Sequence, residues 1–244
     1  MFKRKLLALV FTSLLLVLCT AEGHSSQSTV VLQPVADTYA NSMYVRFNVT
    51  SIYGTLSAMF IGNAYDPVIK VYGHGRAFIT FDLSTIPSEA KIVSAYLVLY
   101  MYFAPNRSTI LDAYRVTGNW VEKALNWTNQ PPTTDRITYT VSVPSTSNTW
   151  ISWDITDDVK VWHSKSAPNY GTMIRIREEV EAENQAAGFY SKEFVISEYC
   201  PRLELTYSLD DPAFNAGAPI LIAGAVFAGF VLLLIGVRKF KPVS

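Results

Sequence analysis

Between residues 29 and 207 the hydrophobic positions follow the period of β-strands almost throughout. Runs of β-branched and aromatic residues are separated by clusters of Gly, Pro, Asn and Ser, a pattern that predicts short strands joined by turns. The predicted strands lie at residues 29–32, 58–61, 68–72, 77–81, 92–103, 110–116, 137–143, 149–155, 172–176, 188–194 and 202–207. The longest run is apolar on both faces, so we expect a central strand there.

One segment breaks this pattern and has the period of a short helix. Thr156 can cap it, Asp157 and Asp158 suit the positive end of the helix dipole, and Val159 and Trp162 share a face. Ten or so short strands with a single short helix predict an all-β fold, a jelly-roll-like β-sandwich.

An apolar run follows the β-rich part. Residues 218–237 carry no charge, and the tail that follows, 238–244, holds three basic residues. A helix of this length spans about 30 Å, the thickness of the hydrocarbon core of a bilayer. We therefore expect a transmembrane helix rather than a buried core helix, with a stalk at 208–217 before it and a cytoplasmic C-terminus after it.

The N-terminus has the order of a secretory signal. Three basic residues precede an apolar run at 6–18, and small residues follow it. This order predicts a signal peptide at 1–21. The alternatives are a lipoprotein signal, with Cys19 as the lipidated residue, and an uncleaved membrane helix. We expect a single-pass protein of the cell membrane whose main domain, 29–207, is extracellular.

The formal net charge of zero conceals an acidic domain. Three of the 20 basic residues lie before residue 22 and three after residue 217, which leaves 14 against all 20 acidic residues, a net charge of −6. This balance argues against a nucleic-acid partner. Because Cys19 would leave with the signal, Cys200 lacks an intrachain partner and is either a buried thiol or the site of an intermolecular disulfide.

Several short strings occur in a characteristic order. They are ADTY at 36–39, FDLS at 81–84, W-x-E at 120–122, NQP at 129–131, WDIT at 153–156, NYG at 169–171, FYSKE at 189–193 and PRL at 201–203. In this order and spacing the chain resembles the DNRLRE domain, a secreted β-sandwich module related to the family 96 carbohydrate-binding modules. The resemblance covers roughly residues 30–207.

The resemblance implies a jelly-roll module that accompanies polysaccharide-active enzymes, including disaggregatases of archaeal cell-wall matrix, and it does not imply catalysis by the module. Two departures matter. No catalytic domain is attached, so we do not expect an accessory role to a covalently linked enzyme. The run at 68–72 predicts an extra strand, which could pair with another chain.

Tryptophans are the candidate ligand-binding residues, because a flat aromatic ring stacks on the apolar face of a sugar. Trp153 and Trp162 belong to the strings above and are expected in the core. Trp120 and Trp127 lie in an Asn- and Gln-rich loop, and Trp150 alternates with polar residues. These three are the binding candidates. The alternative is that the two loop tryptophans pin the loop to the sandwich.

The acidic residues suggest a cation rather than an enzyme. Asp154, Asp157 and Asp158 are the metal candidates, for structural calcium, although the last two are also explained as first-turn helix residues. We expect no other cofactor. We assign no catalytic residue, because the sequence contains no G-x-S-x-G elbow, no metalloprotease helix and no zinc-ligand spacing.

Three sequons, at Asn48, Asn106 and Asn126, are candidate N-glycosylation sites. The first functional hypothesis is a membrane-anchored, extracellular, non-catalytic module that binds polysaccharide or surface matrix. The second is a structural or adhesive surface protein that assembles with itself or with surface partners. The small residues of the predicted membrane helix and the extra strand motivate this second hypothesis. A matrix polysaccharide hydrolase or lyase ranks third, because it would need paired carboxylates in a cleft.

Overall fold

The computed structural model describes residues 26–181 and 185–209. The predicted signal peptide at 1–21, the transmembrane helix at 218–237 and the tail lie outside the described residues, as does the predicted stalk beyond residue 209. Within the described ranges, no helix has both the length and the apolar character needed to cross a membrane.

The described residues form strands joined by short turns, with one α-helix. The strands are β1 (Ser26–Leu32), β2 (Pro34–Asn41), β3 (Ala58–Asp66), β4 (Val71–Phe81), β5 (Lys91–Phe103), β6 (Thr109–Val116), β7 (Thr133–Val143), β8 (Thr149–Asp154), β9 (Thr172–Ile176), β10 (Ala187–Tyr190) and β11 (Arg202–Leu209). The helix is α1 (Thr156–His163), and three 3-10 turns are η1 (Val45–Phe47), η2 (Trp127–Asn129) and η3 (Ser197–Tyr199). The prediction of an all-β fold with one short helix is confirmed.

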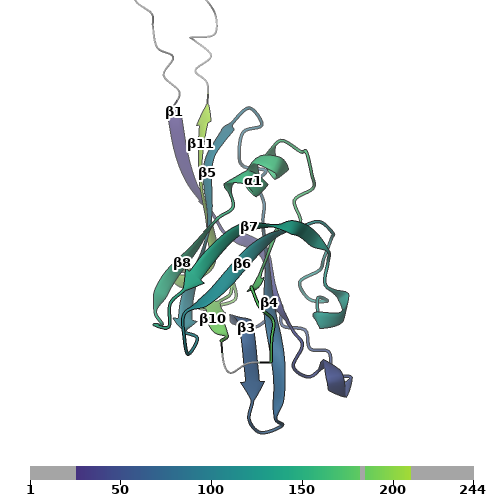
Figure 1. Cartoon of the computed structure of the whole chain (residues 1–244). Coiled ribbons are helices and arrows are strands. Elements are labelled where there is room, and N and C mark those ends of the chain that lie inside the picture. Colours follow the sequence, from purple (N-terminus) through teal and green to yellow (C-terminus); the bar gives the residue numbers. More distant parts are fainter. Residues whose placement is uncertain (1–25, 182–184, 210–244) are drawn as a thin grey trace, which may run out of the picture. The chain divides into compact units, whose positions relative to one another are not determined.

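All strand pairs are antiparallel and belong to one curled sheet (Figure 1). The strand order is β1-β11-β5-β10-β3-β4-β9-β6-β7, with β2 beside β4 and β8 beside β5. We call β1, β11, β5 and β8 half A, and β2, β4, β9, β6 and β7 half B. The four-residue strand β10 and its neighbour β3 connect the two halves.

The core lies between the two halves. β5 is a central strand, as predicted, because it pairs with β8 on one side and with β11 and β10 on the other. Its residues Leu97 and Leu99 are fully buried. Trp153 of β8 is also fully buried, and its indole N–H donates to the carbonyl of Leu111 in half B, 3.4 Å away. Trp153 and Trp162 are therefore core residues, as predicted.

The predicted extra strand at 68–72 is wrong. β3 ends at Asp66 and β4 begins at Val71, so the residues between them form the turn of a hairpin. Asp66 Oδ1 accepts hydrogen bonds from the backbone N–H groups of Val68 and Ile69 at 2.9 and 3.2 Å. Lys70 adopts a φ of 56°. Val68 and Ile69 thus belong to a turn that an aspartate organises, and Val71 and Tyr72 are the first residues of β4, so the segment is not a separate strand.

The predicted cap of α1 is also wrong. The N-cap residue is Ile155, whose side chain makes no capping hydrogen bond. Thr156 is the first helical residue, and its Oγ1 accepts a hydrogen bond from the backbone N–H of Ala95 in β5 at 2.9 Å. The threonine side chain therefore fastens the helix to the sheet instead of accepting a hydrogen bond from a free backbone N–H of the first helical turn. Asp157 and Asp158 do lie in the first turn, as predicted.

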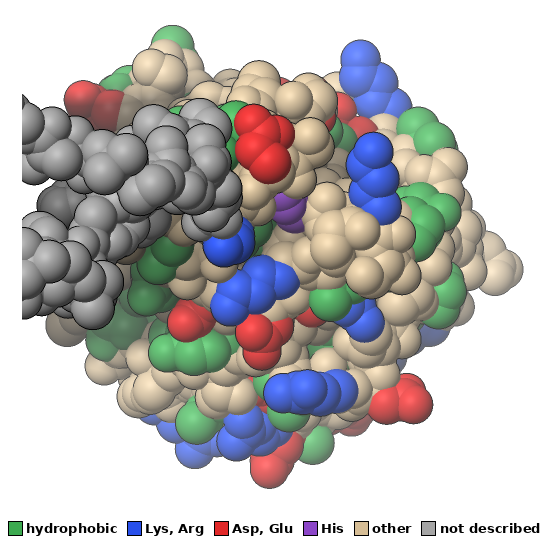
Figure 2. All heavy atoms as spheres, turned by 90° about the horizontal axis from the view of Figure 1, so that it is seen from above, with side chains coloured by type: hydrophobic (Ala, Val, Ile, Leu, Met, Phe, Trp, Pro, Cys, Tyr) green, Lys and Arg blue, Asp and Glu red, His purple; other side chains and the backbone are tan. Residues whose placement is uncertain are grey.

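Cys200 is a buried thiol in the structure, 5% exposed, and burial raises its pKa. Charge is spread rather than gathered on the face shown in Figure 2, where acidic and basic side chains are interspersed. That face carries none of the single-sign patches that nucleic-acid-binding proteins present.

Candidate functional site

A row of polar side chains crosses the outer face of half B. Arg76 of β4 is the register partner of Arg175 in β9, which pairs with Asp112 of β6, and Asp112 pairs with Thr140 of β7. Register partners point to the same side of a sheet. Because the neighbouring residues, such as Ala77, are buried in the core, the row points away from it.

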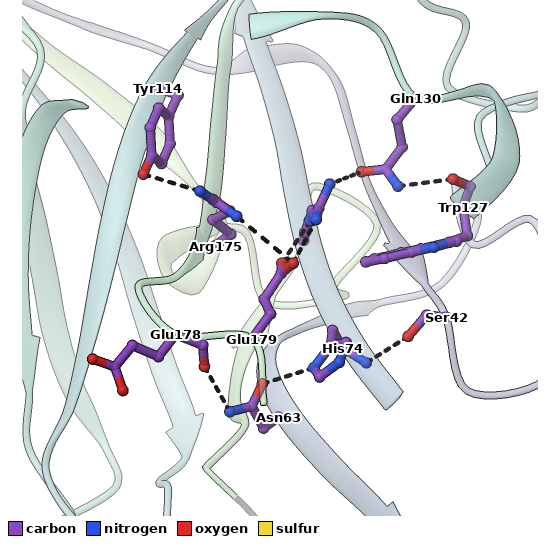
Figure 3. Close-up of polar contacts among 10 residues, drawn as sticks. Ser42, Asn63, His74, Tyr114, Trp127, Gln130, Arg175, Glu178 and Glu179 are labelled. Atoms are coloured by element: carbon purple, nitrogen blue, oxygen red, sulfur yellow. Dashed lines mark hydrogen bonds and ion pairs between the residues drawn. The ribbon is translucent and has the colours of Figure 1, made fainter. Parts of the chain in front are cut away.

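Glu179 joins the two arginines of this row. It follows β9, and its carboxylate accepts hydrogen bonds from Nε and Nη2 of Arg76, the first at 2.6 Å. Nη1 of Arg175 lies 3.7 Å from the same carboxylate, and Nη2 of Arg175 donates to the hydroxyl of Tyr114 at 3.3 Å (Figure 3). Two partly exposed guanidinium groups thus share one carboxylate, so these three side chains together carry one positive charge.

Trp127 lies against this network. The guanidinium carbon of Arg76 is 4.5 Å from the centre of the Trp127 ring, a cation–π arrangement. Gln130 fixes both residues, because its Oε1 accepts from Arg76 at 3.2 Å and its Nε2 donates to the Trp127 carbonyl at 2.8 Å (Figure 3). Asn126 and Asn129 form a capping box around η2. The loop therefore holds a half-buried indole in a defined position.

A histidine extends the site toward β3. The ring Nδ1 of His74 lies 2.8 Å from Asn63 Oδ1, and Asn63 Nδ2 donates to the carbonyl of Glu178 at 2.9 Å. The His74 ring is 6.4 Å from the Trp127 ring. Burial lowers the pKa of His74, and the nearby Arg76 acts in the same direction, whereas Glu179 opposes it. The imidazole is therefore neutral at neutral pH.

A hollow of about 360 Å³ opens beside this network. Its lining includes Arg76, Arg175, Tyr114 and Gln130, together with residues 131–135. Ligand sites of this kind combine aromatic surface with a few fixed polar groups that determine orientation. The guanidinium N–H groups and the hydroxyl can bond a polar ligand, while Pro131, Pro132 and Met173 of the lining offer apolar surface.

The three predicted ligand-binding tryptophans do not share one surface. Trp120 lies close to Trp127 in the sequence, but its indole N–H donates to the Tyr170 carbonyl at 2.8 Å and its ring packs 6.0 Å from that of Phe78. Trp120, like Trp127, packs against a small second core beneath the loop. For Trp120 the structure favours the alternative in which the indole pins the loop to the sheet.

Trp150 lies on the other half of the sheet. It is 38% exposed on β8, opposite Tyr100 of β5. The guanidinium carbon of Arg202 is 3.9 Å from its ring centre, and the rings of Tyr100 and Tyr199 are 5.0 and 6.4 Å away. Trp150 is therefore part of an aromatic cluster on the outer face of half A, apart from the Trp127 network.

Of the predicted metal candidates, Asp154 and Asp157 line one hollow of about 290 Å³. Asp154 Oδ1 accepts from the backbone N–H of Thr156 at 3.0 Å, and Asp157 is exposed. Asp158 is buried, accepts from Thr138 Oγ1 at 2.6 Å and has a pKa raised by burial. None of the three belongs to the group of acidic side chains that the structure brings together.

That group consists of Asp37, Glu122 and Glu193. Among the described residues, these are the carboxylates that bring one oxygen each to within 4.8 Å of one another. They belong to neither the Trp127 network nor the predicted calcium candidates. The group is the place in the described structure where a metal could be held.

The sequons differ in accessibility. Asn48 and Asn106 are exposed, the first at the end of η1 and the second between β5 and β6. The side chain of Asn126 caps η2: its Oδ1 accepts from the Thr128 backbone and hydroxyl, and its Nδ2 lies 3.4 Å from the Ala124 carbonyl. A glycan on Asn126 Nδ2 would leave the Oδ1 cap in place and would affect only the long contact with the Ala124 carbonyl.

Arg76, Arg175 and Glu179 were not predicted as site residues. One signal was present in the sequence: Arg76 and Arg175 are single charges within otherwise apolar strands. A charge at such a position must face away from the core, where it is available to a ligand. Nothing in the sequence indicated that Glu179 would lie beside both arginines.

The comparisons with known proteins identify a family and do not concern individual site residues. No curated protein matches the chain. The profile of carbohydrate-binding module family 96 matches residues 26–207, which is more than half of the chain and covers all of the described strands up to residue 207. The expected relation to carbohydrate-binding modules is therefore confirmed, and the chain belongs to carbohydrate-binding module family 96.

Proposed function

We propose that the chain is a non-catalytic module that binds polysaccharide through the Trp127 network on the outer face of half B. The observation that carries this proposal is the stacking of Arg76 over Trp127 beside the hollow. An indole next to fixed hydrogen-bond donors suits a sugar, which has both an apolar face and a rim of hydroxyl groups.

The charge of the network favours one class of glycan. Arg76 and Arg175 share the single carboxylate of Glu179, so these three side chains carry one positive charge in excess, and Asp135 is the acidic residue of the lining itself. Charge-assisted hydrogen bonds from guanidinium to carboxylate are the strongest of the available contacts. We therefore propose that polysaccharides bearing uronic-acid carboxylates bind more tightly than neutral ones.

The proposed module is a jelly-roll-like sandwich at the outer surface of the cell membrane. The leader at 1–21 and the uncharged run at 218–237 support this location by their sequence. Such a module would hold extracellular matrix close to the membrane. Protease treatment of intact cells tests this proposal, because an extracellular domain is cleaved while a cytoplasmic C-terminal epitope stays protected.

Calorimetric titration of the purified full chain with a polyuronate and with a neutral glucan tests binding. Trp127→Ala should weaken polyuronate binding by about tenfold or more, the effect of losing a central aromatic contact. Trp150→Ala is the matched control, since it removes the other partly exposed indole, and it should leave the affinity within about twofold. Equal losses in both variants, or no binding of any glycan, would contradict the proposal.

A further inference from the structure

Three carboxylates from distant parts of the chain meet beside β2. Asp37 lies on β2, Glu122 in the segment between β6 and β7, and Glu193 after β10. One oxygen of each lies within 4.8 Å of the others. Like charges at this separation repel one another unless a cation or a proton lies between them.

Asp37 is the least exposed member, at 1%. Its Oδ2 accepts a hydrogen bond from the backbone N–H of Lys192 at 2.8 Å, but its Oδ1 is buried without any hydrogen-bond partner. A buried polar atom that lacks a partner is costly, and native structures contain few of them. This free oxygen belongs to the carboxylate that contributes to the acidic group.

The other two carboxylates are held in place by hydrogen bonds. Glu122 Oε1 accepts from the backbone N–H of Asp37 at 2.8 Å. Glu193 Oε2 accepts a hydrogen bond from Ser191 Oγ at 3.0 Å. The backbone N–H of Glu193 in turn donates to Ser191 Oγ at 3.2 Å. The geometry of the group is therefore fixed by the fold and does not depend on three freely rotating side chains.

Lys192 supplies one positive charge to the group. Its Nζ is 3.1 Å from Glu122 Oε1 and also contacts Glu193 Oε1. If all three carboxylates are ionised, one ammonium leaves two negative charges without a counter-ion. Burial raises the pKa of Asp37 to about 8, so without a metal a proton compensates one of them. A divalent cation would compensate both, and the Asp37 carboxylate, whose Oδ1 has no hydrogen-bond partner, would be one of its ligands.

We propose that Asp37, Glu122 and Glu193 bind a calcium ion. Calcium takes oxygen ligands at 2.3–2.6 Å, so two ligands on opposite sides of one ion are separated by about 5 Å, which agrees with the spacing of the three carboxylates. The ion would fasten β2 to the segment before η2 and to the segment after β10. This site is independent of the proposed glycan-binding network, which uses none of the three carboxylates.

Calcium titration of the chelator-treated full chain tests the site. We expect one ion per chain, and a Tm that rises by several degrees at about 1 mM calcium, since extracellular calcium modules bind in about the 0.1–1 mM range. Glu193→Gln keeps an oxygen near Ser191 but removes a charge, and should weaken calcium binding about tenfold. The control Glu89→Gln changes an exposed carboxylate and should have no effect.

A second variant distinguishes a calcium site from a group of carboxylates whose negative charge is compensated by the Lys192 ammonium alone. Lys192→Met should destabilise the calcium-free chain and strengthen calcium binding, because it removes the competing cation. Restoration of the Tm by calcium supports the site. The proposal is overturned if the wild type shows neither bound calcium nor a Tm shift, or if calcium fails to restore Lys192→Met. These readouts involve no glycan, so they stand whether or not the glycan-binding proposal holds.

Discussion

Two tryptophans on opposite halves of the sheet carry the same local arrangement. Arg76 lies 4.5 Å from the ring centre of Trp127 on half B, and Arg202 lies 3.9 Å from that of Trp150 on half A. In each pair a glutamate also holds the arginine, Glu179 in the first and Glu204 in the second.

The surroundings of the two pairs differ. Trp127 lies on a loop next to a hollow lined by polar side chains of several strands. A second arginine, Arg175, also contacts Glu179, the glutamate that holds Arg76. Trp150 lies within a strand, and tyrosines from β5 and η3 are packed around it. A stacked Arg–Trp pair therefore does not by itself identify a binding site. The polar groups and the free volume beside it decide what it can bind.

The largest difference between the two faces should appear when each arginine is removed. Arg76→Met should weaken polyuronate binding by about 30-fold or more, because a central arginine typically contributes about 2 kcal/mol or more. Arg202→Met, the equivalent change on half A, should alter binding by less than about twofold. Calorimetric titration measures both. If Arg202→Met weakened binding as much as Arg76→Met, the assignment of the site to half B would be wrong.

Neutralising the two glutamates should produce a smaller difference in polyuronate affinity, and the change on half B should be an increase. Glu179→Gln removes a carboxylate that repels an acidic ligand and releases two guanidinium groups, so polyuronate affinity should rise about fivefold, equivalent to about 1 kcal/mol. Glu204→Gln should leave the affinity unchanged. The increase should shrink at high salt, because a partly exposed site is screened. A loss of affinity in Glu179→Gln would show that this glutamate positions Arg76 more than it repels the ligand.

The smallest predicted difference concerns pH. Since the pKa of His74 is lowered in the folded state, the folded chain resists protonation there more than the unfolded chain does. The resulting stability is present above the unfolded pKa of about 6.5 and decreases as the pH falls below it. Urea unfolding at pH 7 and pH 5 should show a smaller decrease in His74→Gln than in the wild type. Equal decreases in the two proteins would contradict this role of His74.

The strand pattern could be predicted from sequence wherever one face of a strand is apolar. β5 and the two core tryptophans follow directly from such patterns. β2 was missed because two of its buried residues, Asp37 and Thr38, are polar and so conceal the alternation. The hairpin turn after Asp66 was mistaken for a strand because its residues are apolar, and only the aspartate's hydrogen bonds reveal it.

The candidate sites were harder to predict because they depend on strand register. Trp127 could be named from its residue type and its loop. Its partner Arg76 faces Arg175 only because β4 pairs with β9 in one register. Asp37 and Glu122 are 85 positions apart, and no local spacing indicates that they meet. The order of the motif strings was enough to identify the family, whereas the contacts between those strings could be seen only in the folded structure.

The pairing of the first and last strands has a mechanical consequence. Ser26 is the register partner of Leu209, and β11 also pairs along its length with β5. A pulling force that reaches the domain through Leu209, along the axis of β11, loads its ladders with β1 and β5 in shear. Many hydrogen bonds must then break together instead of one after another. A domain loaded in shear would therefore stay folded, with its ligand bound, at a force that would separate β11 if its hydrogen bonds broke one at a time.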